Sequence, residues 1–362
     1  MDPESSANSP TQPANLPPDV SVDSTVRGNT PFFSRTDKPR PEIIEGLIRE
    51  GQLVALAGDY GIGKSPLLAD LVVHRVRGGS WNGRHVQSGP VIHIDLESPG
   101  STYRGAINRT AARVGFPPPI VPNELEIYLE HDDPPTEGTS ALWRALEGTV
   151  PQADCLKLLN KALTRNPNAL VLIDPLELFF KLQSGKKEQV LALYSKLRKL
   201  LANFPHSAIL MTFNLRKRDR KVARANLLTD PREWLLEVSG VSDILSRSDV
   251  RLGIDKRGDD MVVVNGIRRS EEMQPLLLRS ALLNDDPTTP AGFCLIPAQE
   301  LSLRSVLSEG QAEHWRKLPG TFTFEEALRL MGKSTFSRLK QRTESLGLLL
   351  KTDRGSYHKV IE

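Results

Sequence analysis

The sequence has few cysteines and almost no excess of charge of either sign, and these two features exclude several classes of protein. The two cysteines among 362 residues, Cys155 and Cys294, lie far apart and in no metal-ligand spacing. Neither a disulfide framework nor a cysteine-rich metal site is therefore expected. Lysine and arginine number 47 against 44 aspartate and glutamate residues, a formal net charge of +3. Any attraction to nucleic acid must come from local basic patches.

Long apolar runs are also missing. No stretch reaches the roughly 18 apolar residues that a membrane-spanning helix requires, and the N-terminus lacks the charged-then-apolar pattern of a secretory signal. Together with the low cysteine content, these features predict a reduced, cytoplasmic protein that has no membrane partner.

Composition divides the chain into four parts. Residues 1–40 are rich in Pro, Ser, Asn and Asp and have few large apolar side chains, which predicts a disordered tail. Residues 41–283 carry the main globular domain. A Pro-, Asp- and Thr-rich break opens a linker at residues 284–300, and residues 301–362 form a second, small domain.

Strand-like apolar runs alternate with helical patterns between residues 41 and 283. This alternation predicts an α/β fold with a mostly parallel, twisted sheet flanked by helices. The expected strands are Leu53–Ala57, Val91–Leu96, Leu170–Ile173, Ala208–Thr212, Asp249–Ile254 and Met261–Asn265.

A glycine-rich turn, GDYGIGKSP, follows the first of these strands. Its spacing, Gly58-x-x-x-x-Gly63-Lys64-Ser65, fits the P-loop, in which backbone N–H groups wrap a phosphate chain. The Lys64 charge would meet the β- and γ-phosphates, and the Ser65 hydroxyl would take one Mg²⁺ position. The motif therefore predicts a site for ATP and Mg²⁺ formed by Gly58, Asp59, Tyr60, Gly61, Ile62, Gly63, Lys64, Ser65 and Pro66.

Two later strands carry carboxylates to their C-terminal ends. In ALVLIDPLELFF the apolar run ends at Asp174, which suits the Walker B role of holding a Mg²⁺-bound water; the structural alternative is a strand-capping aspartate. In GPVIHIDLESPG the strand ends at Glu97, where a carboxylate would polarise the water that attacks the γ-phosphate. Asp95, on the same strand face, is the rival base.

The strand AILMTFN ends in two polar side chains, Thr212 and Asn214. They stand where a sensor of the γ-phosphate is expected, although polar strand ends are also common for structural reasons. We expect Asn214 to contact the nucleotide.

The ordered set GDYGIGKS, HIDLESP, LVLIDPLE, LMTFNLRK and VSGVSDILSRSDVRL resembles the RecA-like hexameric helicases of the plasmid RepA type, which are related to DnaB. The resemblance covers roughly residues 42–283. It implies a RecA-like P-loop ATPase core with phosphate binding by Gly63, Lys64 and Ser65, catalysis by Glu97, Mg²⁺ ordering by Asp174 and sensing by Asn214. The chain departs from the family where His or Gln usually ends the sensor strand, and an arginine is missing from the segment at residues 238–242.

The same resemblance implies an arginine finger. In the family, a basic residue near the end of a late strand reaches the γ-phosphate of the neighbouring subunit. Here Arg268 and Arg269 follow the expected strand Met261–Asn265, so either one is a candidate for that role in trans. The alternative is a solvated basic turn.

Two basic loops are candidates for contact with single-stranded DNA. In RecA-like rings, the loops after the Walker B and sensor strands face the central channel, and two basic loops on one sheet edge would form an electrostatic groove. The alternative is a solvated charged surface. The candidate residues are Lys186 and Lys187 in the first loop and Arg216, Lys217, Arg218, Arg220, Lys221 and Arg224 in the second.

Residues 303–361 resemble a winged helix-turn-helix. Two helical patterns flank Gly332, and LLLKTDRGSYHKVI is typical of a hairpin, so Ser334–Ser345 would be the recognition helix and Asp353–Gly355 the wing tip. Such a unit either binds duplex DNA or makes protein contacts.

These patterns favour an ATPase that works as a DNA motor, a hexameric helicase in the replication of a plasmid, phage or other mobile element, with single-stranded and duplex DNA and replication proteins as partners. The main alternative is an ATP-switched DNA-binding regulator that does not separate strands. A small-molecule kinase is disfavoured, because the basic loops stand where a ring channel would be.

Overall fold

The computed structural model describes residues 39–116, 124–129, 143–145, 152–182, 187–215, 225–236, 242–257, 261–269, 271–280, 292–296, 303–346, 348–353 and 355–360. The tail predicted at residues 1–40 lies outside this part of the chain, apart from its last two residues.

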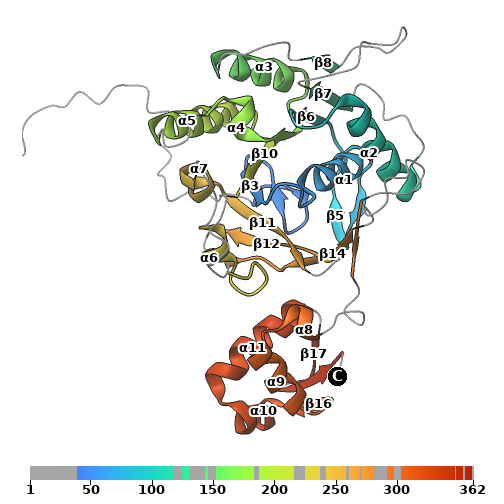
Figure 1. Cartoon of the computed structure of the whole chain (residues 1–362), viewed down its shortest axis with the longest axis vertical. Helices are drawn as coiled ribbons and strands as arrows, with labels where there is room; N and C mark the ends of the chain where they lie inside the picture. Colours follow the sequence, from blue (N-terminus) through green and yellow to red (C-terminus); the bar gives the residue numbers. More distant parts are fainter. Residues whose placement is uncertain are drawn as a thin grey trace, which may run out of the picture. The chain divides into compact units, whose positions relative to one another are not determined.

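A large mixed sheet runs through the main domain (Figure 1). Within the described residues its order is β15-β14-β12-β11-β3-β10-β9-β6-β7-β8, with β13 paired to β12. The strands from β11 to β8 are parallel, and those from β12 to β15 are antiparallel. The parallel strands are β3 (Leu53–Gly58), β6 (Val91–Asp95), β7 (Leu125–Leu129), β8 (Trp143–Ala145), β9 (Leu170–Asp174), β10 (Ala208–Asn214) and β11 (Val250–Arg257). The antiparallel strands are β12 (Met261–Arg268), β13 (Glu271–Glu272), β14 (Leu276–Ser280) and β15 (Phe293–Leu295).

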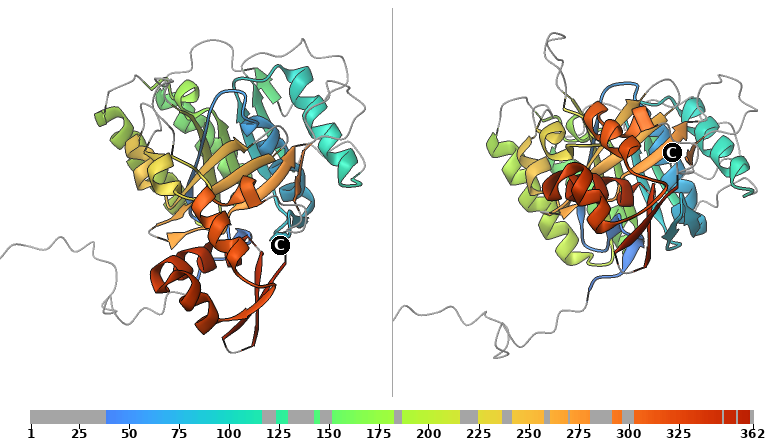
Figure 2. Two further views of the ribbon diagram at one scale, coloured as in Figure 1. Left: turned by 60° about the horizontal axis from the view of Figure 1, so that its bottom comes forward. Right: turned by 90° about the horizontal axis from the view of Figure 1, so that it is seen from below.

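Helices cover both faces of this sheet, because alternate residues of its central strands enter two separate apolar layers. Val54 and Leu56 of β3 pack in the layer that contains α1 (Lys64–Arg77) and α2 (Gly100–Arg113). Leu53 and Ala55 pack in the opposite layer. Figure 2 shows helices on both sides of the sheet. That second layer contains α3 (Gln152–Arg165), α4 (Leu176–Phe179), α5 (Lys187–Asn203), α6 (Pro231–Leu235) and α7 (Ser242–Arg247).

A small antiparallel sheet adjoins the α1 layer. Its order is β2-β1-β5-β4, and its strands are β1 (Glu42–Ile44), β2 (Ile48–Arg49), β4 (Gly79–Trp81) and β5 (Arg84–Val86). Trp81 is buried and donates a hydrogen bond through its indole nitrogen to Asp70 of α1 at 2.7 Å. This contact anchors the small sheet to α1, the helix that follows the P-loop.

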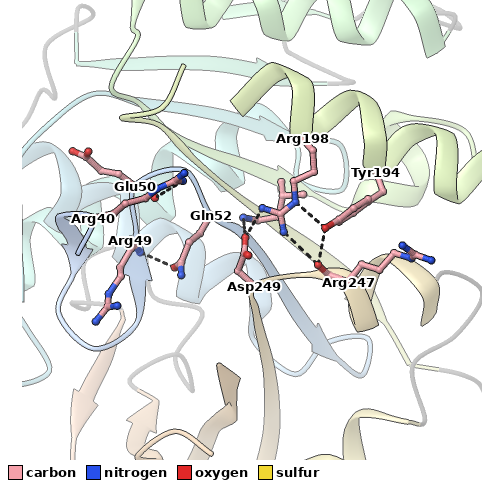
Figure 3. A network of polar contacts seen from close by, with 9 residues as sticks. Arg40, Arg49, Glu50, Gln52, Tyr194, Arg198, Arg247 and Asp249 are labelled. Carbon is pink, nitrogen blue, oxygen red and sulfur yellow. Dashed lines mark hydrogen bonds and ion pairs between the residues drawn. The ribbon is translucent and has the colours of Figure 1, made fainter. Parts of the chain in front are cut away.

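A polar network holds the start of β3 against α5 (Figure 3). The Oδ2 atom of Asp249 accepts hydrogen bonds from the backbone N–H of Leu53 at 2.9 Å and from Arg198 at 2.6 Å. Arg198 and Tyr194 also donate to the carbonyl oxygen of Arg247. These bonds fix the N-terminal end of β3. The P-loop, which follows the other end of this strand, is therefore held in a fixed position.

The C-terminal elements form a compact helix and hairpin unit. They are α8 (Leu303–Val306), α9 (Glu309–Lys317), β16 (Thr321–Thr323), α10 (Phe324–Met331), α11 (Lys333–Ser345), β17 (Leu349–Asp353) and β18 (Ser356–Lys359), with the sheet order β16-β18-β17. Capping boxes start α9 at Ser308 and α10 at Thr323. The rings of Phe322, Phe336 and Tyr357 pack together in its core. The two helices expected around Gly332 and the expected hairpin are present.

All six predicted strands of the main domain are present. The sheet nevertheless continues beyond the boundary predicted at residue 283, because β15 pairs with β14 inside the segment predicted to be a linker. Among the described helices, none combines the length and apolar character needed to cross a bilayer.

Candidate nucleotide-binding site

The P-loop lies between the end of β3 and the start of α1. At two of its glycines, a side chain would come too close to neighbouring residues. A Cβ atom on Gly58 would lie 2.5 Å from Cγ2 of Ile254. Gly63 has a φ of +106°, and a Cβ there would lie 3.3 Å from Cζ of Phe293. The loop therefore passes tightly under β11 and β15 with a backbone that favours glycine.

The other P-loop residues differ in exposure. Tyr60 is 86% exposed, whereas Ile62 packs against the apolar layer of α1. Pro66 lies in the first turn of α1, where the backbone N–H groups have no acceptor within the helix. The helix can therefore accept this proline without losing a hydrogen bond.

Lys64 is the first residue of α1, and its side chain is folded over the P-loop. Its Nζ atom donates hydrogen bonds to the carbonyl oxygens of Gly58 at 3.1 Å and Asp59 at 3.0 Å, and to Oδ1 of Asn214 at 2.9 Å. Burial lowers the pKa of Lys64, and the charge of Asp174 opposes this effect most strongly. The ammonium group is thus held at the loop, where a phosphate chain is expected.

Ser65 and Asp174 provide the oxygen atoms that suit Mg²⁺. The Ser65 hydroxyl donates to Oδ2 of Asp174 at 2.6 Å, and Thr212 donates to Oδ1 of the same carboxylate at 2.5 Å. Asp174 is fully buried at the end of β9. Mg²⁺ usually takes one or two protein oxygens together with waters and substrate phosphates, so this donor pair fits the ion predicted for the site.

Glu97 and Asp95 play different structural parts. Asp95 is 1% exposed, and its Oδ1 atom accepts the backbone N–H groups of Glu97 at 3.0 Å and Ser98 at 2.9 Å. Glu97 is exposed just beyond β6. Burial and the nearby charge of Asp174 raise the pKa of the Glu97 carboxyl. Asp95 therefore shapes the turn, and Glu97 is the carboxylate presented to solvent.

Asn214 links the two charged groups of the site. It is the last residue of β10 and stands opposite Gly58 in the parallel ladder with β3. Its side-chain oxygen accepts from Lys64 at 2.9 Å, and its side chain partly opposes the rise in the pKa of Glu97 that burial causes. The order β3-β10-β9-β6 places the P-loop and the ends of the other three strands at one edge of the sheet. The structure thus brings together Lys64, Ser65, Glu97, Asp174 and Asn214.

Residues 25–220, more than half of the chain, match the family model described as an AAA domain. The chain belongs to the AAA domain family. This membership makes the chain an ATPase-type nucleotide-binding protein.

Partial similarities extend to other proteins. In Dictyostelium discoideum, ABC transporter G family member 9 is 32% identical over 27% of this chain and 7% of the transporter, and member 14 is 34% identical over 24% and 7%. This chain therefore spans less than a tenth of the length of these curated relatives. The solved structure of the RadB recombinase covers 68% of this chain and 92% of its own, with a TM-score of 0.44 and 13% identity. The family match, and not these similarities, carries the assignment.

One residue of the AAA domain site, Glu177, was not predicted from the sequence. It lies in α4, three residues after Asp174. Its carboxyl is mostly shielded from solvent, near the backbone of Asn214 and the charges of Lys64 and Glu97. Burial raises its pKa to about 7. The sequence signal was an acidic residue one turn beyond the Walker B aspartate, in the run DPLE.

Arg268 and Arg269 lie at the other edge of the sheet from the P-loop of their own chain. Arg268 is paired with Val250, which is itself paired with Val54 at the start of β3. Arg268 also lies 3.7 Å from Glu42 in an ion pair. The P-loop starts four residues further along β3, roughly 13 Å away at the rise of a strand. A finger role for either arginine thus stays a prediction about the neighbouring subunit.

The residues predicted to contact DNA fall mostly outside the described chain. This holds for Lys186, Arg216, Lys217, Arg218, Arg220, Lys221 and Arg224. Lys187 is described only as the first residue of α5. The described ends of the two loops, at Leu182 and Leu215, lie after α4 and β10.

Proposed function

We propose that this AAA domain protein is an ATP-hydrolysing DNA motor with a RecA-like core, a helicase of the RepA and DnaB type that acts in the replication of a plasmid, phage or other mobile element. The observation that carries the proposal is the hydrogen bond from Lys64 to Asn214 at 2.9 Å. It ties the P-loop lysine to the last residue of β10, whose side chain also acts on the candidate base Glu97. The predicted DNA-binding loop begins two residues later.

Each residue of the site has a distinct part in the proposed hydrolysis. Backbone N–H groups of the P-loop and the Lys64 charge bind the phosphates, and Ser65 and Asp174 hold Mg²⁺, which neutralises phosphate charge when bound. Glu97 accepts a proton from water as the water oxygen forms a bond to the γ-phosphorus. The bond from that phosphorus to the ADP oxygen breaks at the same time, and Asn214 senses whether the γ-phosphate is present.

The basic loops supply the proposed contact with single-stranded DNA. Residues 216–224 contain six basic residues and one acidic residue, and they follow the sensor strand directly. Lys186 and Lys187 come after α4 in the sequence. Phosphates of a single strand would bind such a groove without sequence preference.

The C-terminal unit supports a second contact with DNA. We propose that its helices and hairpin form a winged helix, and the element order with the sheet β16-β18-β17 supports this proposal. Its α11 carries exposed Lys333 and Arg338, and residues 311–362 hold ten basic against six acidic residues. We assign α11 as the recognition helix for duplex DNA.

A hexameric ring is the proposed working assembly. The positions of Arg268 and Arg269, away from the P-loop of their own chain, support a role across a subunit boundary. Replication or mobile-element proteins are the proposed partners of the ring.

An ATPase and unwinding assay tests this function. The wild-type protein should hydrolyse ATP faster with single-stranded DNA and should separate the strands of a forked duplex. Lys64→Ala should do neither, because the charge that meets the phosphates is lost. Hydrolysis without unwinding would favour the alternative, an ATP-switched DNA-binding regulator. A hydrolysis rate that does not change when DNA is added would contradict both the motor and the regulator.

A further inference from the structure

Helices α3 and α5 lie side by side on one face of the main sheet, and a groove runs between them (Figure 1). The groove encloses about 430 Å³. Its floor contains Leu156 of α3 and Leu200 of α5, which pack at the edge of the apolar layer beneath the two helices. None of the described residues that line it belongs to the P-loop or carries a carboxylate of the nucleotide site. The groove is therefore a separate surface feature of the domain.

Four lysines stand along the two sides of this groove. Lys157 and Lys161 are one helical turn apart on α3, and Lys196 and Lys199 are one turn apart on α5. All four side chains are exposed. Among the described residues that line the groove, none is acidic. The sides of the groove therefore carry charge of one sign.

The arginines of the same two helices have carboxylate partners of their own. Arg165 of α3 pairs with Glu126, and Arg198 of α5 pairs with Asp249 at 2.6 Å. Apart from Lys157, the groove lysines have no such partner in the described part of the chain. Because like charges that lie close together repel, carboxylates brought into the groove would lower the electrostatic energy of this surface.

An apolar floor between lysine sides fits an acidic, amphipathic protein segment better than it fits nucleic acid. Sites for single-stranded nucleic acid usually present aromatic rings on which the bases stack. The described lining of this groove contains neither an aromatic residue nor an arginine. An amphipathic helix, in contrast, lays its apolar side chains into a groove and keeps its charged side chains at the rim. Carboxylates at that rim would meet the lysines.

We propose that the groove between α3 and α5 is the docking site for a partner protein, which binds through an amphipathic segment with leucine-type side chains on one face and Asp or Glu beside them. The proposal requires neither ATP hydrolysis nor DNA binding, because the described lining of the groove includes no residue of the nucleotide site. A groove of this size suits a weak, transient contact.

Fluorescence anisotropy of a labelled peptide tests this proposal with the full chain. The probe is a peptide of Leu and Glu, about 18 residues long so that it can form a helix, with its leucines on one face. Lys161→Glu combined with Lys199→Glu should weaken binding about tenfold or more, because like charges then face one another. Leu156→Gln should also weaken it, since the floor becomes polar. Lys256→Glu combined with Lys351→Glu, at exposed sites outside the groove, changes the net charge equally and should stay within about twofold of the wild type.

A second peptide has the same composition in an order that spreads the leucines around the helix, and it should bind more weakly than the probe. Equal affinity for the two peptides, or no effect of Leu156→Gln, would overturn the proposal, because the apolar floor would then play no part. Equal losses in the groove variant and its control would also overturn it, since net charge alone would explain the binding. Titration with a labelled oligothymidylate tests the alternative ligand: if the groove variant loses this binding and keeps the peptide, the groove binds nucleic acid and the proposal is wrong. Circular dichroism checks that each variant is folded.

Discussion

The Ser65 hydroxyl donates a hydrogen bond to Oδ2 of Asp174 at 2.6 Å, across 109 positions of sequence. The bond ties the first turn of α1 to the end of β9, while Thr212 holds the other oxygen of the carboxylate. Asp174 is therefore fixed between the P-loop helix and the sensor strand. Glu97 lies next to this pair, because Leu96 donates its N–H to the carbonyl oxygen of Asp174 at 2.9 Å.

Glu97→Gln should retain ATP binding and lose hydrolysis. The amide has nearly the same shape as the carboxylate, but it is a poor base. General-base catalysis contributes about 10²- to 10⁴-fold, so turnover should fall by roughly that factor. Nucleotide affinity from fluorescence titration and phosphate release measure the two properties separately.

Asp95→Asn is the matched control for that substitution. The asparagine side-chain oxygen can still accept the N–H groups of Glu97 and Ser98, so the turn and the hydrolysis rate should be nearly unchanged. If Asp95→Asn stops hydrolysis while Glu97→Gln does not, the base has been assigned to the wrong carboxylate.

Glu177→Gln should stabilise the fold in a way that depends on pH. Because burial raises the pKa of Glu177 to about 7 in the folded state, ionisation of its carboxyl lowers the free energy of unfolding. This loss is absent below the unfolded pKa near 4.5 and increases between pH 4.5 and 7. The gain in unfolding free energy from Glu177→Gln should therefore grow across that window, to roughly 1–3 kcal/mol, and stay level above it.

Urea unfolding of the variant and the wild type from pH 5 to 8 measures this difference. Subtracting the two curves removes the contribution of other titrating groups such as Glu97. Glu188→Gln, at an exposed site, should show almost no dependence on pH. A difference that stays constant from pH 5 to 8 would show that the Glu177 carboxyl titrates like an exposed one.

Local patterns were sufficient to predict the P-loop and the ends of the main strands. The apolar run of β3 and the spaced glycines lie within a few residues of one another, so Lys64 and Ser65 could be placed without the fold. The alternation of side chains along a strand could not show whether Asp95 or Glu97 is the base, because this alternation holds only as far as the strand continues. The strand ends at Asp95, and the turn that this residue stabilises is what presents Glu97.

Features that depend on strand order or direction could not be predicted. Lys64 meets Asn214 because β10 lies beside β3, and their separation in sequence gives no sign of this. Arg268 follows an apolar strand like the others, but β12 is antiparallel, so its end lies at the opposite edge. The three-residue strand β15 was hidden in a segment with the composition of a linker.

Removing residues 301–362 should leave basal ATP hydrolysis intact and weaken duplex DNA binding by about tenfold or more, if α11 reads duplex DNA. The cut must follow β15, because Phe293 packs against the P-loop at Gly63. Lys333→Ala combined with Arg338→Ala, both exposed on α11, should reproduce much of the loss in the intact chain. Unchanged duplex affinity in both proteins would assign this unit to protein contacts.

The final prediction concerns the basic loop at residues 216–224. Replacing Arg216, Lys217, Arg218, Arg220 and Lys221 with Ala should weaken binding of single-stranded DNA and flatten its dependence on salt. Each lost phosphate contact removes roughly 0.7 from the slope of log affinity against log salt concentration. Basal ATP hydrolysis should survive, since none of these side chains belongs to the P-loop, but its stimulation by single-stranded DNA should fall.

A variant that loses a similar charge elsewhere separates a specific channel from a general electrostatic effect. Lys157, Lys161, Lys196 and Lys199 are exposed on α3 and α5, and their replacement by Ala changes the net charge by nearly as much. The two proteins are compared by titrating a labelled oligonucleotide at several salt concentrations. If the loop variant and this control shift the slope equally, long-range charge explains the binding. If the loop variant alone flattens it, residues 216–224 contact the phosphates, and the strand that carries Asn214 leads directly to the DNA.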